Sequence, residues 1–141
     1  MTFRVRPFEE RDRPALEAIY RECRFEATWL PPAARGKSDF ARDTEGEALL
    51  VAVGGDDEPE AFVALWEPKA FIHHLYVRNG ARRKGIGRRL LDALASRFPR
   101  PWTLKCVRAN DRALAFYLRE GWREISSGIG EDGPYAVMEK S

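Results

Sequence analysis

The sequence predicts one α/β (α+β) domain built on a single mixed sheet. The sheet is mostly antiparallel, has six to seven strands and a central parallel pair, and is flanked by helices. Three observations carry this prediction. The 141 residues fit a single domain spanning 1–141. Short turn-rich connections join three strand-like segments in the first half. Strand-like and helix-like segments then alternate, which favours a parallel strand–helix–strand unit.

The first half begins with a strand and a helix. Residues 2–8 alternate apolar and polar side chains, which predicts a strand. Asp12 is a suitable N-cap for a helix that reaches about Phe25, with Pro14 in its first turn. The segments that follow are a loop over 28–36, a short helix over 38–42, and strands over 48–53, 61–67 and 71–77. The turn at 54–59 and the break at Pro68 make these three strands an antiparallel meander.

The second half alternates between the two element types. Ile86, Leu90, Leu94 and Phe98 share one helical face, and Pro99 ends that helix. The remaining elements are a strand over 102–107, a helix from the caps Asn110 and Asp111 through Glu120 to a left-handed Gly121, and an antiparallel pair over 122–127 and 135–138 around a 128–133 turn.

The composition is that of a soluble globular protein. No apolar run approaches the ~20 residues of a membrane span, and the first 13 residues lack the apolar core of a secretory signal, so we expect a cytoplasmic protein without membrane contact. Cys23 and Cys106 lie in apolar segments and are expected to be buried free thiols. The net charge of +2 gives no general argument for nucleic-acid binding.

One basic segment indicates an anion-binding site. Six of the twelve residues from Arg78 to Arg89 are basic, and Gly85 and Gly87 lie among them between a strand and a helix. Glycines allow a ligand to approach the backbone, and the first-turn amides of a helix attract phosphate. A P-loop would need a Gly-Lys-Ser/Thr ending, and a dinucleotide fingerprint a third glycine, and both are missing. The alternative is a solvated basic helix start.

Two motifs in this half resemble those of the GNAT N-acetyltransferases. Arg82-x-x-Gly85-x-Gly87 matches the family's CoA-binding pattern Arg/Gln-x-x-Gly-x-Gly/Ala. Asn110-x-x-Ala113-x-x-Phe116-Tyr117-x-x-x-Gly121-Trp122 is similar to the family's second signature, with Trp in place of the final Phe. The resemblance is close over about residues 71–127, and the first 70 residues share only the element order.

The resemblance implies an acetyl-CoA-dependent N-acetyltransferase that uses no metal, and it is compatible with a homodimer. The acetyl group would pass to a primary amine by direct attack on the thioester. Tyr117 would protonate the departing thiolate as the general acid; the alternative is a tyrosine that only caps the core. We expect Phe116 and Ala113 to pack inward and Tyr117, one residue on, to lie toward an edge. The implied cosubstrate-binding residues are Leu75, Tyr76 and Val77, the turn residues Arg82, Arg83, Lys84, Gly85, Ile86, Gly87 and Arg88, and Asn110, Ala113 and Phe116.

Several groups are candidates for the general base. An ammonium acceptor must lose a proton before it attacks, and a base that titrates near neutral pH suits this task. His73 and His74 are the only histidines, and strand alternation puts them on opposite faces unless a bulge intervenes. Glu67 is a third candidate. Ordered water can replace all three.

A non-catalytic acyl-CoA sensor is the alternative function, because it differs only in lacking proton-transfer groups. A nucleic-acid-binding module is disfavoured, since only Tyr76 and Phe98 interleave the basic stretch. Nothing in the sequence identifies the amine acceptor.

Overall fold

The computed structural model describes residues 3–36 and 38–141, and within them it has the predicted seven-stranded mixed sheet, in the order β1-β2-β3-β4-β5-β7-β6. The strands are β1 (Arg4–Pro7), β2 (Ala48–Val53), β3 (Pro59–Trp66), β4 (Phe71–Val77), β5 (Trp102–Val107), β6 (Arg123–Gly130) and β7 (Gly133–Lys140). The helices are α1 (Arg13–Glu26), α2 (Pro32–Arg35), α3 (Phe40–Asp43), α4 (Ile86–Ala95) and α5 (Asp111–Arg119). Among the described strands, only β4 and β5 pair in parallel.

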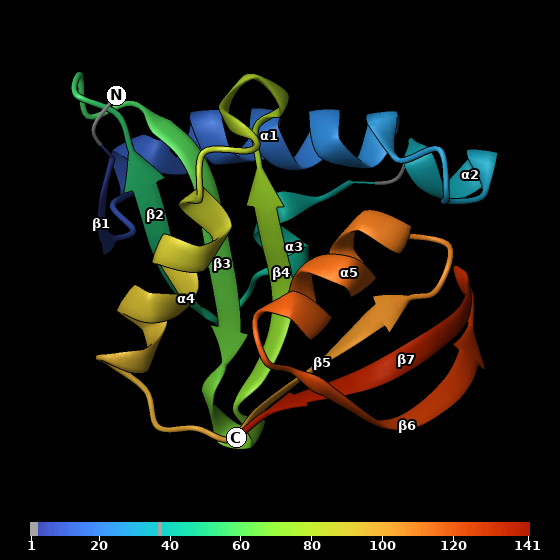
Figure 1. Cartoon of the computed structure of the whole chain (residues 1–141). Coiled ribbons are helices and arrows are strands. Elements are labelled where there is room, and N and C mark those ends of the chain that lie inside the picture. Colours follow the sequence, from blue (N-terminus) through green and yellow to red (C-terminus); the bar gives the residue numbers. More distant parts are fainter. Residues whose placement is uncertain (1–2, 37) are drawn as a thin grey trace.

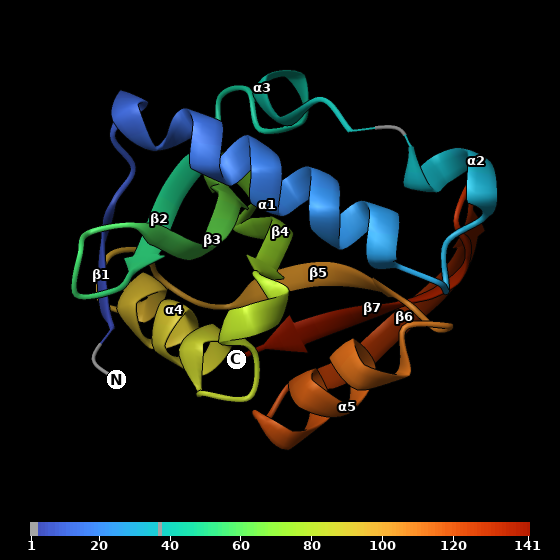
Figure 2. The same ribbon diagram turned by 90° about the horizontal axis from the view of Figure 1, so that it is seen from above.

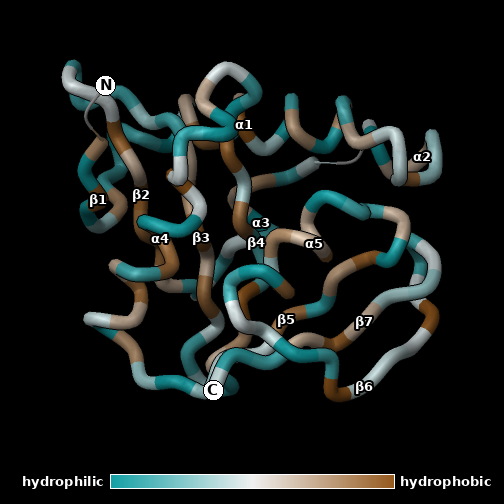
Figure 3. Tube along the Cα trace, viewed as in Figure 1, coloured by the Kyte–Doolittle hydropathy of each residue, from teal (hydrophilic) through white to brown (hydrophobic). Residues whose placement is uncertain are grey.

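Helices cover both faces of the sheet. Figure 2 shows α1 and α3 on one face and α4 and α5 on the other. Each helix turns an apolar stripe to the sheet: Leu16, Ile19, Tyr20 and Cys23 of α1 are buried, and so are Ile86, Leu90, Leu91 and Leu94 of α4. The strands between them are apolar on both faces, which Figure 3 shows as brown segments along β2, β3 and β4.

Most predicted elements are found, with differences at their ends. Residue 2 of the first predicted strand lies outside the described residues. The loop over 28–36 contains the short helix α2, which begins at Pro32 because proline suits a first helical position. The last hairpin is tighter than predicted: β6 reaches Gly130 and pairs it with Gly133, leaving a two-residue turn. Helix α4 ends at Ala95, although Phe98 N–H still donates to the Leu94 carbonyl at 2.9 Å.

The Asp12 cap prediction was wrong in its mechanism. Asp12 directly precedes α1 but makes no side-chain cap bond to it. Its carboxylate instead accepts bonds from Glu9 N–H at 2.8 Å and from Arg6. The acid therefore joins β1 to the start of α1. The other predicted cap is confirmed, since Asn110 Oδ1 accepts from Ala113 N–H at 3.3 Å.

The parallel strands β4 and β5 separate almost at once. The pairing recorded for them over the described residues is Phe71 opposite Thr103, where Thr103 N–H donates to the Ala70 carbonyl at 3.1 Å. Beyond that point β5 turns away with β7 and β6, as Figure 1 shows. One edge of β4 is thus left without a strand partner over most of its length. None of the described helices is long and apolar enough to cross a membrane.

Candidate active site

The open edge of β4 presents backbone groups toward β5. Arg78 N–H donates to the Glu60 carbonyl at 2.9 Å on the β3 side. Hydrogen-bonded and non-hydrogen-bonded pairs alternate along an antiparallel ladder. Leu75 and Val77 therefore turn their N–H and C=O groups away from β3, into the space where β5 has diverged, while their side chains pack on the core.

The N-terminus of α4 lies directly after this edge and has the form of an anion cradle. Gly85 is the N-cap in left-handed conformation (φ 75°), and no side chain of the described residues caps the helix there. A Cβ on Gly85 would meet no described atom within 4 Å, so the backbone is open to a ligand. Arg83 also has a positive φ of 65°, and both Arg83 and Lys84 are exposed. The first-turn amides of α4 thus directly follow two exposed cationic residues in the chain.

The second glycine of the motif serves helix packing. A Cβ on Gly87 would lie 3.4 Å from Cζ of Phe116, which is on α5. Gly87 therefore lets α4 and α5 approach, while Ile86 is buried and offers only its backbone to a ligand. Arg88 is exposed and pairs its Nε with Glu120 Oε1 at 3.1 Å.

Arg82 is turned away from the cradle. Its Nε donates to the Val77 carbonyl at 3.1 Å, and its Nη2 contacts Cys23 Sγ at 3.5 Å. Cys23 Sγ also donates to the Val77 carbonyl at 3.5 Å. The first residue of the CoA-type motif thus anchors the end of β4 to α1. The Val77 carbonyl is consequently already engaged.

Tyr117 is more enclosed than the sequence suggested. The expectation placed Phe116 and Ala113 inward and Tyr117 toward an edge. In the structure Tyr117 is the buried residue of α5, and Phe116 and Ala113 are partly buried. It packs against Trp122 and lies near Cys106 of β5, on the side where β4 and β5 diverge. Burial raises the pKa of the Tyr117 phenol above its usual value, so this hydroxyl stays protonated and can donate.

A β-bulge brings both histidines to one carboxylate. Strands β3 and β4 pair Ala64 with His74 but Leu65 with Ile72, so His73 is the extra residue. The His73 and His74 rings lie 5.9 Å apart. His73 Nδ1 contacts Glu47 Oε2, and His74 Nε2 lies 4.0 Å from Glu47 Oε1. Without the bulge, the side chains of these two adjacent residues would lie on opposite faces of the sheet.

The two histidines differ in environment. His74 packs against Tyr20 and Tyr76, and its Nε2–H donates to the Asp43 carbonyl at 3.1 Å. Burial lowers the pKa of His74 to about 4. The His73 side chain is 44% exposed and can reach a substrate. Glu67, the third candidate base, is exposed in a 3-10 turn after β3.

Sequence reasoning missed Glu47. Its side chain is only 3% exposed, and burial raises its carboxyl pKa. It lies one residue before the buried strand β2. An acid in that position was the available signal, but its partners are 26 and 27 positions away in the chain. Only the pairing of β2 with β3 and of β3 with β4 makes them neighbours.

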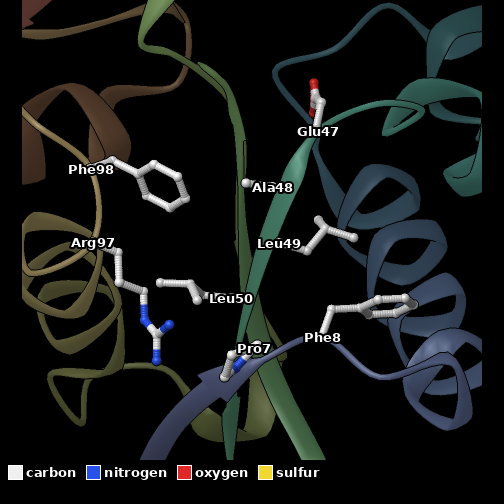
Figure 4. A pocket seen from close by; sticks show the side chains of 8 residues that line it. All are labelled: Pro7, Phe8, Glu47, Ala48, Leu49, Leu50, Arg97 and Phe98. Atoms are coloured by element: carbon white, nitrogen blue, oxygen red, sulfur yellow. The ribbon is translucent and has the colours of Figure 1, made fainter.

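A separate hollow of about 320 Å³ opens beside β1, β2 and the end of α4. It is lined by Pro7, Phe8, Glu47, Ala48, Leu49, Leu50, Arg97 and Phe98. Figure 4 shows the Glu47 carboxylate pointing away from the other lining side chains. The lining includes nothing from β4 or β5, and Glu47 is the one lining residue that also belongs to the site described above.

Comparisons with known proteins identify the same architecture. The family model described as the acetyltransferase (GNAT) family matches residues 10–122. A search of curated proteins found no match.

Several solved structures are similar over nearly the whole chain. Apo-form YjaB from Escherichia coli has a TM-score of 0.77 and 22% identity, covering 99% of this chain and 97% of that one. A phosphinothricin acetyltransferase from Sinorhizobium meliloti, in complex with acetyl-CoA, has a TM-score of 0.76 and 21% identity, covering 99% and 88%. YncA from Salmonella typhimurium, with acetyl-CoA, has a TM-score of 0.74 and 16% identity, covering 99% and 94%. At these identities the likeness concerns the fold.

Proposed function

Because this chain belongs to the acetyltransferase (GNAT) family, we propose that it is an acetyl-CoA-dependent N-acetyltransferase acting on a primary amine. The observation that carries the proposal is the open β4 edge running directly into the uncapped start of α4. Two of the similar structures are complexes with acetyl-CoA, which supports the same cosubstrate here. The acceptor is an amine of unassigned class, and no metal enters the scheme.

The residues of this region fit acetyl-CoA in two parts. The pyrophosphate would lie against the backbone at Gly85, Ile86 and Gly87, beside the exposed Arg83 and Lys84. The pantetheine arm would run along β4 and hydrogen-bond the backbone as an additional strand does. The Val77 carbonyl already accepts a hydrogen bond from Arg82. The hydrogen bonds to pantetheine would therefore come from the backbone of Leu75 and from the Val77 N–H. Asn110, Ala113 and Phe116 would close the opposite side. By the same alternation the backbone groups of Tyr76 pair with β3, so Tyr76 would make no backbone hydrogen bond to the cosubstrate.

The reaction follows from groups on the two sides of this edge. The acceptor nitrogen forms a bond to the thioester carbonyl carbon, and the carbon–sulfur bond breaks. The amine proton passes to one of the histidines of the bulge, directly or through water. The sulfur takes a proton from the Tyr117 hydroxyl, which burial keeps protonated. Neither cysteine supplies a nucleophile, because both are buried and burial raises the pKa of Cys106 to about 11.

Calorimetric titration with acetyl-CoA tests the cosubstrate site. We expect saturable one-to-one binding, weakened at least tenfold by Arg83→Glu, because the substitution puts a negative charge beside the pyrophosphate. The matched control is Arg97→Glu, which makes the same charge change at an exposed position beyond the opposite end of α4, about 15 Å away along the helix. Absence of binding by the intact protein, or equal losses in both variants, would contradict the proposal.

Substitution of Tyr117 separates an enzyme from an acyl-CoA sensor. If Tyr117 protonates the leaving thiolate, Tyr117→Phe should lower kcat by about 100-fold, with less than a threefold change in the Kd for acetyl-CoA. The loss follows because the ring remains in place while the proton donor is removed. Trp122→Phe, which alters the packing against the same ring, is the control for structural change. An unchanged kcat in Tyr117→Phe would remove Tyr117 from the mechanism.

A further inference from the structure

The Glu47 carboxylate is buried and only half satisfied. Its side chain is 3% exposed, and Oε1 accepts no hydrogen bond from any residue in the described ranges. Oε2 contacts His73 Nδ1. Buried acceptors in folded proteins nearly always have partners, because an unpaired acceptor has lost its bonds to water without replacing them. This buried carboxylate contacts His73, the extra residue of the β4 bulge, and its position there calls for a physical explanation.

This contact selects one form of the His73 ring. A carboxylate oxygen can only accept, so neutral His73 must carry its proton on Nδ1 and donate it to Glu47. Nε2 is then the unprotonated nitrogen. Because the His73 side chain is 44% exposed, this lone pair is open to the acceptor side. His73 also lies just past Phe71, where β4 and β5 part.

His74 has the opposite arrangement. Its Nε2 is committed to the Asp43 carbonyl, which also only accepts, so the proton of the neutral ring is on Nε2. The ring is enclosed by Tyr20 and Tyr76, and its side chain is 14% exposed. A buried ring that is hard to charge is a poor acceptor for the proton of an ammonium.

We propose that Glu47 is a positioning residue that orients His73, so that His73 rather than His74 receives the proton of the attacking amine. The proposal rests on the proposed acetyl transfer. A carboxylate behind a catalytic imidazole acts in this way. It fixes which ring nitrogen carries the proton, and its negative charge stabilises the imidazolium that forms. The proton moves from the amine nitrogen to His73 Nε2, Nδ1–H remains bonded to Glu47, and the proton is later released to solvent.

The other ionisable groups around this pair come from three elements. Asp43 of α3 faces Glu47 and opposes its ionisation, and His74 of β4 lies beside both rings. On α1, the hydroxyl of Tyr20 donates to Asp43 at 2.7 Å, and Arg24 faces His74 and opposes its protonation. None of these lies between Glu47 Oε2 and His73 Nδ1, so the direct contact dominates the local field.

Nitrogen-15 NMR of the two imidazoles in the intact, ligand-free protein provides the first test. The chain has only two histidines, so the spectrum contains only two rings. We expect one ring in the Nδ1–H form and the other in the Nε2–H form, with His73→Gln assigning the first. Glu47→Ala should abolish the Nδ1–H preference and leave the His74 signals in place. A His73 ring in the Nε2–H form would overturn the proposal. This measurement does not depend on turnover.

The pH dependence of kcat/KM gives the second test. Glu47→Gln keeps the shape but removes the charge, so the plateau should fall about tenfold, because no carboxylate then compensates the imidazolium that forms. The Kd for acetyl-CoA should be unchanged. Glu45→Gln, an exposed acid two residues earlier, should leave both quantities unmoved. A plateau that stays in place in Glu47→Gln, or an acidic limb that disappears only in His74→Gln, would overturn the proposal. If the intact protein neither binds acetyl-CoA nor turns over, the proposed function fails, and the NMR result still decides the link between Glu47 and His73.

Discussion

Adjacent residues of one strand can have unrelated chemistry, and His73 and His74 illustrate this. The bulge lets both approach Glu47, but only His74 packs against the rings of Tyr20 and Tyr76. Burial therefore lowers the pKa of His74 to about 4, whereas His73 stays accessible. The sequence pair His-His gives no hint of this difference, since both residues are identical and share one element.

The depressed pKa of His74 predicts acid sensitivity of the fold. In the unfolded chain this ring binds a proton as the pH falls below about 6.5, while in the folded protein it does so only near 4. Stability contributed by neutral His74 is thus present above pH 6.5 and is lost between pH 6.5 and 4. We expect a loss of up to about 3 kcal/mol in the free energy of unfolding over this range.

Urea denaturation at several pH values measures this effect. His74→Gln keeps a donor for the Asp43 carbonyl but cannot titrate, so it should remove the fall in stability. The comparison is needed because Glu47 acts in the opposite direction: burial raises its pKa, so its protonation as the pH falls favours the folded state. Equal slopes in the parent protein and in His74→Gln would show that His74 is not the group responsible.

At the scale of elements, one charged network ties three segments together. Arg6 of β1 makes two bonds of 2.8 Å to Asp12, before α1, and one of 3.0 Å to Asp57, in the turn between β2 and β3. The side chains of Arg6 and Asp12 are 12% and 2% exposed. The network therefore fixes the first strand against the helix that covers the histidine face of the sheet.

Removal of Asp12 should be costly. Asp12→Asn should lower the free energy of unfolding by about 3 kcal/mol, because it leaves Arg6 with a buried, partly uncompensated charge. Hydrogen bonding to Arg6 lowers the pKa of Asp12, so this contribution is present above its unfolded pKa near 3.8 and is lost as the pH falls through the lower, folded value. Chemical denaturation at pH 7 and pH 3 checks both statements. Glu10→Gln, which affects only an exposed pair with Arg13, is the control and should have no measurable effect at pH 7.

At the scale of the molecule, the site arises where two sub-sheets part. Strands β1 to β4 form one antiparallel unit and β5 to β7 another, joined through Phe71 and Thr103 (Figure 1). One face of this junction carries α4 and α5 with the anion cradle and Tyr117. The other carries α1 and α3 with the histidines and Glu47 (Figure 2). Cosubstrate and acceptor groups can thus meet at the junction from opposite faces. A homodimer stays a prediction, as does the cytoplasmic location.

Local patterns in the sequence were enough to predict the fold class, the cradle and the second signature. Each depends on features that neighbouring residues decide: helical periodicity, the left-handed turn at Gly85, the Asn110 cap and the left-handed Gly121. The Asn110 cap and the left-handed Gly121 were confirmed because a glycine or a cap residue acts within a few positions of itself, while the cradle stays a prediction. Element ends were less certain, as the short helix α2 and the extended final hairpin show.

What the tertiary structure alone decided is which side chains meet. Arg82 was expected at the phosphates but anchors Val77, Tyr117 was expected at an edge but is buried, and Glu47 was not expected at all. Each outcome depends on packing between segments that lie far apart in the chain, or on a register shift of one residue in β4. A single bulge reverses which face a side chain takes, and periodicity within the strand cannot reveal it. The sequence by itself thus determined the family and predicted a cosubstrate-binding segment, while the sheet register decided which side chains surround His73 and His74.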